Sequence, residues 1–586
     1  MPLTVAEVGP TELTGPVIAV GATAIAAAPA TTHASAEAER RLAIPRYLRM
    51  REANRVAVKT VLGEWKVCVR ASVSAVILEN GVIRTLDPQL PTGRALAIAG
   101  AYVAGGVGVH ETALASPEVV NLGGRCVLPA FTDSHVHFPT WSLAQRQVKL
   151  DGCTSIEEAL DRVRAAEVAP GRWLRGYGWR DGDWSPRAEP TKELLDVVTG
   201  ETPAILISKD YHSVWLNSAA LAVAGGDLEV HGGVVERDAG GEATGILREE
   251  SAWRFRDRYV ITTEAEWVEA TRTGLKLVGS RGVCAIHDKD GWLGAPGIFQ
   301  RLRDDGNLSL RVWGSIPHEQ LDSAAALSLR SGFGDEHLRI GYLKCFMDGT
   351  LGSQTALMTD GTGVEITSRA ELEEIIRCGA ERGWPVGVHA IGDQANRNAL
   401  DAFESTREAW EPMGLRHRIE HAQCLAPEDL PRFAELGIAC SVQFSHAPSD
   451  RDLADRLWAD RLGGTYSFRS LLESGALVAN GSDAPVEELD PLAGIAAGVL
   501  RSIDERPAWR PEEALTIEQA LHATCVAPTF LSGDERRRGR LIPGLLADLV
   551  VLDRDPLAVE PQELHDLQVV ATMVGGRWVH NPPPWD

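Results

Sequence analysis

The sequence predicts an α/β fold built around a (β/α)8 TIM-type barrel. Between residues 129 and 533, eight short apolar runs alternate with amphipathic helical stretches, which is typical of parallel strands joined by helical crossovers. Most of the runs end on a polar or titratable residue. A doubly wound open sheet is the alternative, but it would usually carry a glycine-rich phosphate loop after its first strand, and the sequence has none.

The predicted barrel strands follow one another in chain order, and helical stretches such as 368–383 and 394–410 separate them. The strands are FTDSHVHF (131–138), GVCAIHDKD (282–290), LRVWGSI (310–316), RIGYLKCFMDG (339–349), PVGVHAIGD (385–393), RIEHAQ (418–423), IACSVQFSH (438–446) and ALVANGSDAP (476–485).

Both ends of the chain are rich in short β runs. Residues 73–128 and 534–586 therefore predict one small β-sandwich domain built from both chain ends. Within it, segment 74–87 predicts a hairpin whose turn is Asn80-Gly81. Residues 1–70 carry no recognisable chemistry and are expected to form an N-terminal extension.

A long insertion, at about 140–275, separates the first two predicted barrel strands. It contains a predicted strand at 204–215 and a predicted hairpin at 232–249. Seven of the chain's 16 tryptophans also lie in it. The insertion is expected to reach over the barrel mouth, although tryptophans in such a segment more often form its core than line a pocket.

The composition of the chain indicates what kind of molecule it can bind. Lys and Arg total 58 against 81 Asp and Glu, a net charge of −23, which disfavours nucleic acid and anionic membranes. No apolar run approaches the roughly 18–20 residues of a membrane span. The nine cysteines show no C-x-x-C pair or disulfide framework. We therefore expect a cytoplasmic protein that acts on a small molecule. Both a monomer and a homodimer are compatible with the sequence.

Ligand-type residues recur at the ends of the predicted barrel strands. His135 and His137 lie two apart, so in a strand both imidazoles face one side. The pair alone is equally compatible with two structural histidines. However, Lys344, His389, His421 and Asp483 occupy similar positions on later strands. Because barrel enzymes place their sites at this end of the strands, the series predicts one metal site.

These motifs resemble those of the amidohydrolase superfamily. TDSHVH, VHAIGD, RIEHAQ, NGSDAP and the closing PGLLADLVVLD carry the resemblance, which covers about residues 73–586. The DGTLGSQTA loop and the segment KDYHSVWLNSAAL are closer to the branch that contains N-substituted formamide deformylases.

The resemblance implies two divalent metal ions, with zinc expected. His135 and His137 would bind the first ion with Asp483, and His389 and His421 would bind the second. Lys344 would carry a carbamate derived from CO2 and bridge both ions. The alternative for Lys344 is a buried lysine paired with a carboxylate such as Asp348.

The resemblance also implies how the site would act. Hydroxide held between the metals would attack a carbonyl, and Asp483 would pass its proton to the leaving group. His446 is a candidate catalytic residue at the developing oxyanion, with a plain loop histidine as its alternative. Five residues are expected to bind substrate, three from the insertion and two from a loop: His212, Trp215, Glu249, Gly352 and Ser353.

The sequence thus predicts a metal-dependent hydrolase that cleaves an amide-type C–N bond, other than a peptide bond, in a small, mainly apolar substrate. The same ligands would also serve an ester or lactone hydrolase, or a metal-dependent isomerase or lyase. A non-catalytic regulatory barrel is the remaining alternative, and loss of a metal ligand would be its signature.

Overall fold

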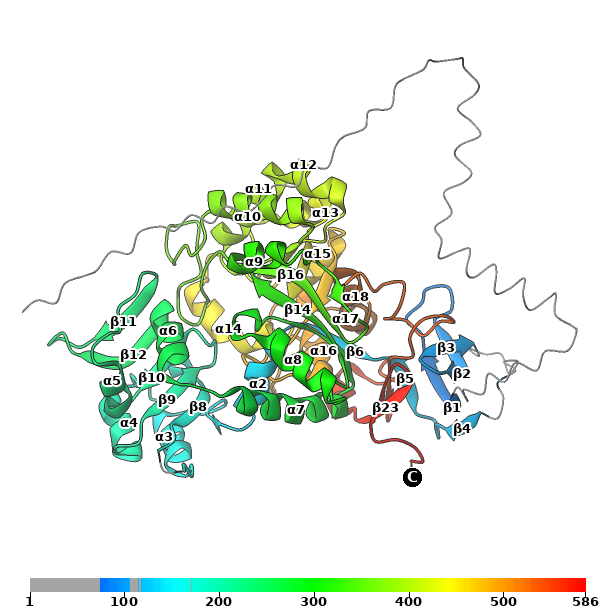
Figure 1. The fold of residues 1–586 in the computed structure, drawn as a ribbon, viewed down its shortest axis with the longest axis horizontal. Helices are drawn as coiled ribbons and strands as arrows, with labels where there is room; N and C mark the ends of the chain where they lie inside the picture. The colour runs from blue at the N-terminus through cyan, green and yellow to red at the C-terminus, as the bar shows by residue number, and fades with distance from the viewer. Residues whose placement is uncertain (1–73, 106–113, 115–116, 170, 586) are drawn as a thin grey trace, which may run out of the picture. The chain divides into compact units, whose positions relative to one another are not determined.

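The computed structural model describes residues 74–105, 114, 117–169 and 171–585 (Figure 1). The predicted N-terminal extension, residues 1–70, lies outside these residues. Residues Val73–Asp586 form one compact unit. In the part of the chain that the structure describes, no helix is long and apolar enough to cross a membrane.

Eight parallel strands form the predicted barrel, in the predicted chain order. They are β6 (Phe131–Val136), β13 (Val283–Asp288), β14 (Arg311–Pro317), β16 (Leu338–Phe346), β17 (Val386–Ala390), β18 (Arg418–His421), β19 (Ala439–Val442) and β20 (Val478–Asn480). The barrel nearly closes, because the ends of β6 and β20 meet through two backbone hydrogen bonds. Asp483 N donates to His135 O at 2.7 Å, and His137 N donates to Ala484 O at 2.9 Å.

Helices between the strands cover the barrel (Figure 1). Reciprocal capping boxes begin three of them, so their first turns satisfy backbone amides that would otherwise lack acceptors. The larger helices are α7 (Glu264–Ser280), α8 (Ala295–Asp304), α10 (Arg369–Arg382), α11 (Asp393–Ser405), α14 (His446–Leu457), α16 (Pro491–Leu500) and α17 (Ile517–Cys525). The shorter ones are α2 (Phe138–Ala144), α9 (Leu321–Ala326), α12 (Arg407–Trp410), α13 (Leu430–Leu436), α15 (Phe468–Glu473) and α18 (Ala527–Leu531).

Strands from both chain ends join in one eight-stranded sheet, in which β21 pairs antiparallel with β5. Its members are β1 (Ala75–Arg84), β2 (Thr92–Ala99), β3 (Tyr102–Gly105), β4 (Glu118–Asn121), β5 (Cys126–Pro129), β21 (Leu549–Leu552), β22 (Val569–Val574) and β23 (Arg577–His580). A separate apolar cluster, which includes Leu78, Ile98 and Met573, forms the core of this sheet.

The predicted hairpin at Asn80-Gly81 is wrong. β1 continues through both residues, and its register with β2 shifts between Glu79 and Ile83. Asn80 adopts a left-handed φ of 60°, and a Cβ on Gly81 would lie 2.4 Å from Arg125 O. The Asn-Gly pair therefore forms an irregularity inside one strand that lets a neighbouring segment approach.

The insertion forms its own six-stranded sheet, drawn at the left of Figure 1. Its elements are β7 (Val148–Lys149), α3 (Ile156–Arg164), β8 (Leu174–Trp179), α4 (Lys192–Thr199), β9 (Ala204–Ser208), β10 (Ser213–Leu216), α5 (Ser218–Ala224), β11 (Gly233–Arg237), β12 (Ala243–Glu249) and α6 (Glu250–Tyr259). The antiparallel pairing of β11 with β12 confirms the hairpin predicted at 232–249.

The single strand predicted at 204–215 is instead two antiparallel strands, β9 and β10. Asp210 makes the turn, because its Oδ1 accepts hydrogen bonds from Ser208 Oγ at 2.5 Å and from His212 N at 3.2 Å. Tyr211 completes it with a left-handed φ of 62°. The turn brings Tyr211 and His212 to the wall of the cavity at the barrel mouth.

Candidate metal centre

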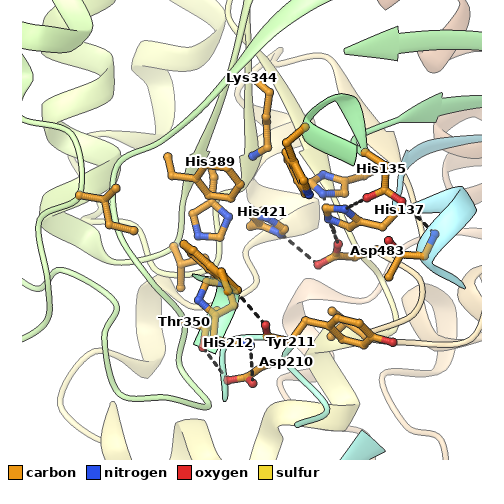
Figure 2. A pocket seen from close by; sticks show the side chains of 18 of the residues that line it. His135, His137, Asp210, Tyr211, His212, Lys344, Thr350, His389, His421 and Asp483 are labelled. Atoms are coloured by element: carbon orange, nitrogen blue, oxygen red, sulfur yellow. Dashed lines mark hydrogen bonds and ion pairs between the residues drawn. The ribbon is translucent and has the colours of Figure 1, made fainter. Parts of the chain in front are cut away.

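A cavity of about 740 Å³ opens at the carboxyl ends of the barrel strands. All six predicted ligand residues line it, and Figure 2 shows them gathered around one space. They are His135, His137, Lys344, His389, His421 and Asp483. Residues that are up to 348 positions apart in the chain therefore line one cavity, as their positions near strand ends predict.

His135 and His137 each donate a hydrogen bond from one ring nitrogen to a carboxylate. Nδ1 of His135 lies 2.8 Å from Glu420 Oε2, and Nδ1 of His137 lies 2.8 Å from Asp290 Oδ1. Because the carboxylates accept hydrogen from Nδ1, each Nε2 keeps its lone pair. The two Nε2 atoms lie 3.2 and 3.6 Å from Asp483 Oδ1. This is the arrangement of imidazoles oriented to bind an ion.

His389 and His421 are oriented in a complementary way. Nε2 of His389 donates to Gly349 O at 3.1 Å, which leaves Nδ1 as its free nitrogen. Nδ1 of His421 donates to Gln443 Oε1 at 2.8 Å, which leaves Nε2. The two ring centroids are 4.5 Å apart. Both rings therefore offer one lone pair to a shared space.

Two of the candidate ligands adopt left-handed backbone conformations that residues other than glycine seldom adopt. His421 has a φ of 74° and Asp483 a φ of 57°. His421 is the last residue of β18, and Asp483 lies three residues beyond the end of β20. Such conformations cost free energy and concentrate at functional sites. One ring nitrogen of His135, one of His421 and a carboxylate oxygen of Asp483 all lie within 4.8 Å of one another.

Lys344 is buried, and its Nζ has no hydrogen-bond partner in the described chain. The amine lies 4.1 Å from the ring centroid of Phe346, and burial lowers its pKa to about 8. Asp348, its alternative partner, is engaged elsewhere. That carboxylate accepts hydrogen bonds from three backbone amides, those of Leu357, Ile391 and Gly392. A carbamate forms from the neutral amine. A buried amine that has no hydrogen-bond partner and a lowered pKa therefore fits conversion to an anionic ligand.

Sequence reasoning missed the buried charges behind His135. Glu420 accepts hydrogen bonds from His135 Nδ1 and from Lys289 Nζ at 2.5 Å, and it forms an ion pair with Arg418, whose Nε lies 2.8 Å from Glu420 Oε1. Burial alone would raise the pKa of Glu420, but Arg418 and Lys289 outweigh burial and hold this pKa well below its usual value. The contacts of Arg418 and Glu420 lead directly to a candidate ligand, His135.

His446 begins α14, and its Nε2 lies 3.8 Å from Asp483 Oδ2. Its Nδ1 accepts a hydrogen bond from Gln423 Nε2 at 3.0 Å. The amide therefore places the ring hydrogen of His446 on Nε2. This side chain lines the cavity as a hydrogen-bond donor beside the candidate ligands.

The insertion contributes His212 to the cavity wall. Its Nδ1 lies 2.6 Å from Glu249 Oε2, and Glu249 Oε1 accepts from Ser353 Oγ at 2.9 Å and Thr355 Oγ1 at 2.6 Å. Glu249 and Ser353 thus lie behind the wall and orient His212. Gly352 lies in the wall, where an added Cβ would come within 2.6 Å of Asp210 Oδ2.

Trp215 does not bind in this cavity, contrary to the sequence interpretation. It is fully buried in the core of the insertion, where its ring packs near Trp179 and Trp184 and its Nε1 donates to Thr191 O. Of the insertion's tryptophans, Trp253 lines the cavity. Trp292 and Phe346 add two more aromatic rings from the barrel. The aromatic wall exists, but most tryptophans of the insertion serve its own core.

The sequence of this chain matches a known family. The sequence pattern of the Amidohydrolase family covers residues 118–580 of this chain. The chain belongs to this family. It is similar to YtcJ of Bacillus subtilis (strain 168), with 31% identity over 79% of this chain and 91% of that protein. It is also similar to the N-substituted formamide deformylase of Arthrobacter pascens, with 27% identity over 85% of this chain and 96% of the relative.

Among solved structures, an uncharacterized metal-dependent hydrolase from Pyrococcus horikoshii OT3 is similar to this amidohydrolase-family chain. The TM-score is 0.70 and the identity 29%, over 83% of this chain and 99% of the other. Together with the family match, this similarity assigns the chain to the metal-dependent hydrolases of the amidohydrolase type. The superfamily resemblance and the barrel predicted from the sequence are thereby confirmed.

Proposed function

We propose that this protein hydrolyses an amide-type C–N bond, other than a peptide bond, in a small substrate. The observation that carries the proposal is the buried Lys344 amine, which has no hydrogen-bond partner in the described chain and shares its cavity with Asp483 and the four histidines that are candidate ligands. An unpaired buried amine is costly unless a ligand completes its surroundings. Carboxylation of Lys344 would meet that requirement.

Six side chains would hold two divalent ions, with zinc as the expected metal. His135, His137 and Asp483 would hold one ion, His389 and His421 the other, and the Lys344 carbamate both. Ions held there would polarise a carbonyl and provide a nucleophile from water near neutral pH.

The chain's own residues would manage the protons. Asp483 would accept a proton from the attacking water and return it to the leaving nitrogen, so that amide and water yield a carboxylic acid and an amine. The Nε2–H of His446 would donate to the carbonyl oxygen as negative charge develops there. His212, held by Glu249, would contact the substrate from the insertion, beside Gly352.

The cavity wall favours a substrate with an apolar or aromatic substituent. Trp253, Trp292 and Phe346 provide aromatic surface, and carboxylates such as Glu371 and Glu374 also line the cavity. A polyanion would be repelled by this wall. The similarity to a relative named N-substituted formamide deformylase supports formamides as the first compounds to test.

The test combines metal analysis with a substrate panel. Protein purified without chelators should contain two divalent ions per chain and should hydrolyse N-benzylformamide faster than a charged amide of similar size. Chelation should abolish turnover, and added zinc should restore it. Full activity in a metal-free protein would contradict the proposal, as would rapid ester or lactone turnover without amide turnover.

A further inference from the structure

Phe346 lines the cavity beside the candidate ligand Lys344. It is the last residue of β16 and follows Lys344 by two positions, so both side chains point to the same face of the strand. The centre of its ring lies 4.1 Å from Lys344 Nζ and 5.1 Å from the centre of the His389 ring. All three side chains line the cavity. The ring therefore occupies the corner of the cavity where β16 and β17 end.

Two tryptophans hold the Phe346 ring in this corner. The rings of Trp253 and Trp292 pack near it, with centroids 6.2 and 5.9 Å away. Trp253 belongs to α6 of the insertion, and its Nε1 donates to Tyr211 O at 3.2 Å. Trp292 belongs to the segment that follows β13. Because aromatic side chains from two other segments pack against the Phe346 ring, it has little room to swing away from the candidate ligands.

Asp483 and His446 lie across the cavity from Phe346. In the nearly closed barrel, β16 and β20 are four strands apart in either direction, so the strand that carries Phe346 lies opposite the strand that precedes Asp483. His446 Nε2 lies 3.8 Å from Asp483 Oδ2. Figure 2 shows His389, the neighbour of Phe346, and Asp483 on different sides of the space between the candidate ligands. An amide bound in this space therefore meets Asp483 and His446 on one side and Phe346 on the other.

We infer that Phe346 restricts the acyl group of the substrate to formyl. A carbonyl carbon spreads its three substituents evenly in one plane. In the proposed reaction the nitrogen faces Asp483 and the oxygen faces His446, so the third substituent points away from both, toward the Phe346 ring. A hydrogen atom fits there, whereas a methyl group would press on a ring that is already packed on its other sides. This inference rests on the proposed function and narrows its substrate class to N-substituted formamides.

The experiment compares N-benzylformamide with N-benzylacetamide on the zinc-loaded full-length protein. Both compounds release benzylamine, so one assay measures both, and their rates of hydrolysis by hydroxide correct for intrinsic reactivity. We expect the corrected kcat/KM to be about 10- to 100-fold higher for the formamide, because one extra methyl group in a filled pocket is rejected to about this extent. Phe346→Ala, which empties the corner, should bring the corrected ratio to within about threefold of unity, and Phe346→Leu should give an intermediate ratio.

Val486→Ala is the matched control, because Val486 also lines the cavity but lies beside Asp483, to whose carbonyl Val486 N donates at 2.9 Å. It should change both rates in the same proportion and leave the corrected ratio at the wild-type value. Melting temperature and zinc content establish that each variant is folded. A corrected ratio near unity in the wild type, or a wild-type ratio in both Phe346 variants, would overturn the inference and leave the proposed function standing. If neither amide is cleaved, the proposed function fails and the inference fails with it.

Discussion

Replacing Glu420 by glutamine should destabilise the barrel and weaken metal binding together. The wild-type carboxylate accepts hydrogen bonds from His135 and Lys289, pairs with the Arg418 guanidinium and is fully buried. An amide keeps one acceptor oxygen, but its NH2 group would face a donor. The substitution also removes the counter-charge of two buried cations.

The size of the effect follows from these contacts. Breaking a buried ion pair by removing one partner costs about 3–5 kcal/mol. Unfolding entropy of about 2.1 cal/mol/K per residue gives about 1.2 kcal/mol/K for a chain of 586 residues, so the melting temperature should fall by about 2–4 °C. Loss of the group that orients a histidine ligand should lower metal affinity by about 10- to 100-fold.

Differential scanning fluorimetry of chelated and zinc-loaded protein, with a competing zinc chelator, measures both effects. Glu381→Gln is the control, because that glutamate is 74% exposed and the charge change is the same. Adding Lys289→Met to Glu420→Gln should recover part of the stability, since one unpaired buried cation is removed. If Glu420→Gln matches the control in melting temperature and zinc affinity, the proposed role of these buried charges is wrong.

Three further predictions concern other parts of the molecule. Lys344→Ala should lose turnover and bind zinc poorly, and millimolar acetate should partly restore turnover; an undiminished rate would exclude the bridging carbamate. Burial lowers the pKa of His417 from 6.5 to about 3, so folded protein should lose about 1.4 kcal/mol for each pH unit below about 6.5 as the unfolded chain takes up a proton. His417→Asn should preserve an acceptor for Val386 N, and its melting temperature should fall less than wild type between pH 6.5 and 4.5; an equal fall would contradict this. Deletion of residues 1–60 should leave kcat/KM unchanged, because none of the candidate ligands lies there; loss of turnover in a folded truncation would refute it.

The barrel was predictable because its strands carry a local and repeated signal. Each is a short apolar run that breaks at a polar residue, and the eight runs are spaced by helices. The failures came from signals that tertiary contacts overrode. Asn80-Gly81 is a strong hairpin signal, yet the approach of Arg125 and the pairing with β2 keep β1 continuous. At Lys209–His212 the reverse occurred, because side-chain hydrogen bonds of Asp210 broke a run that was predicted as one strand.

The candidate ligands were predictable for the same reason, whereas their supporting partners were not. The hydrogen bond from His135 to Glu420 spans 285 positions of the chain, and that from Lys289 to Glu420 spans 131. No periodicity marks such pairs. For Trp215 the residue type was misleading. A tryptophan in the insertion was expected to contact substrate, but Trp215 lies in β10 and is buried in the core of the insertion.

Different parts of the fold therefore carry the chemistry and the selectivity. The candidate ligands end barrel strands, whose positions are set by the hydrogen bonds of the barrel itself. Other parts of the wall come from α6 with Trp253 and from the loop with Gly352, which belong to separate segments. Substrate fit depends on how these segments lie together, so changes in them should alter kcat/KM among substrates and leave zinc binding intact. Changes at Glu420 should weaken zinc binding and leave the order of substrate preference unaltered.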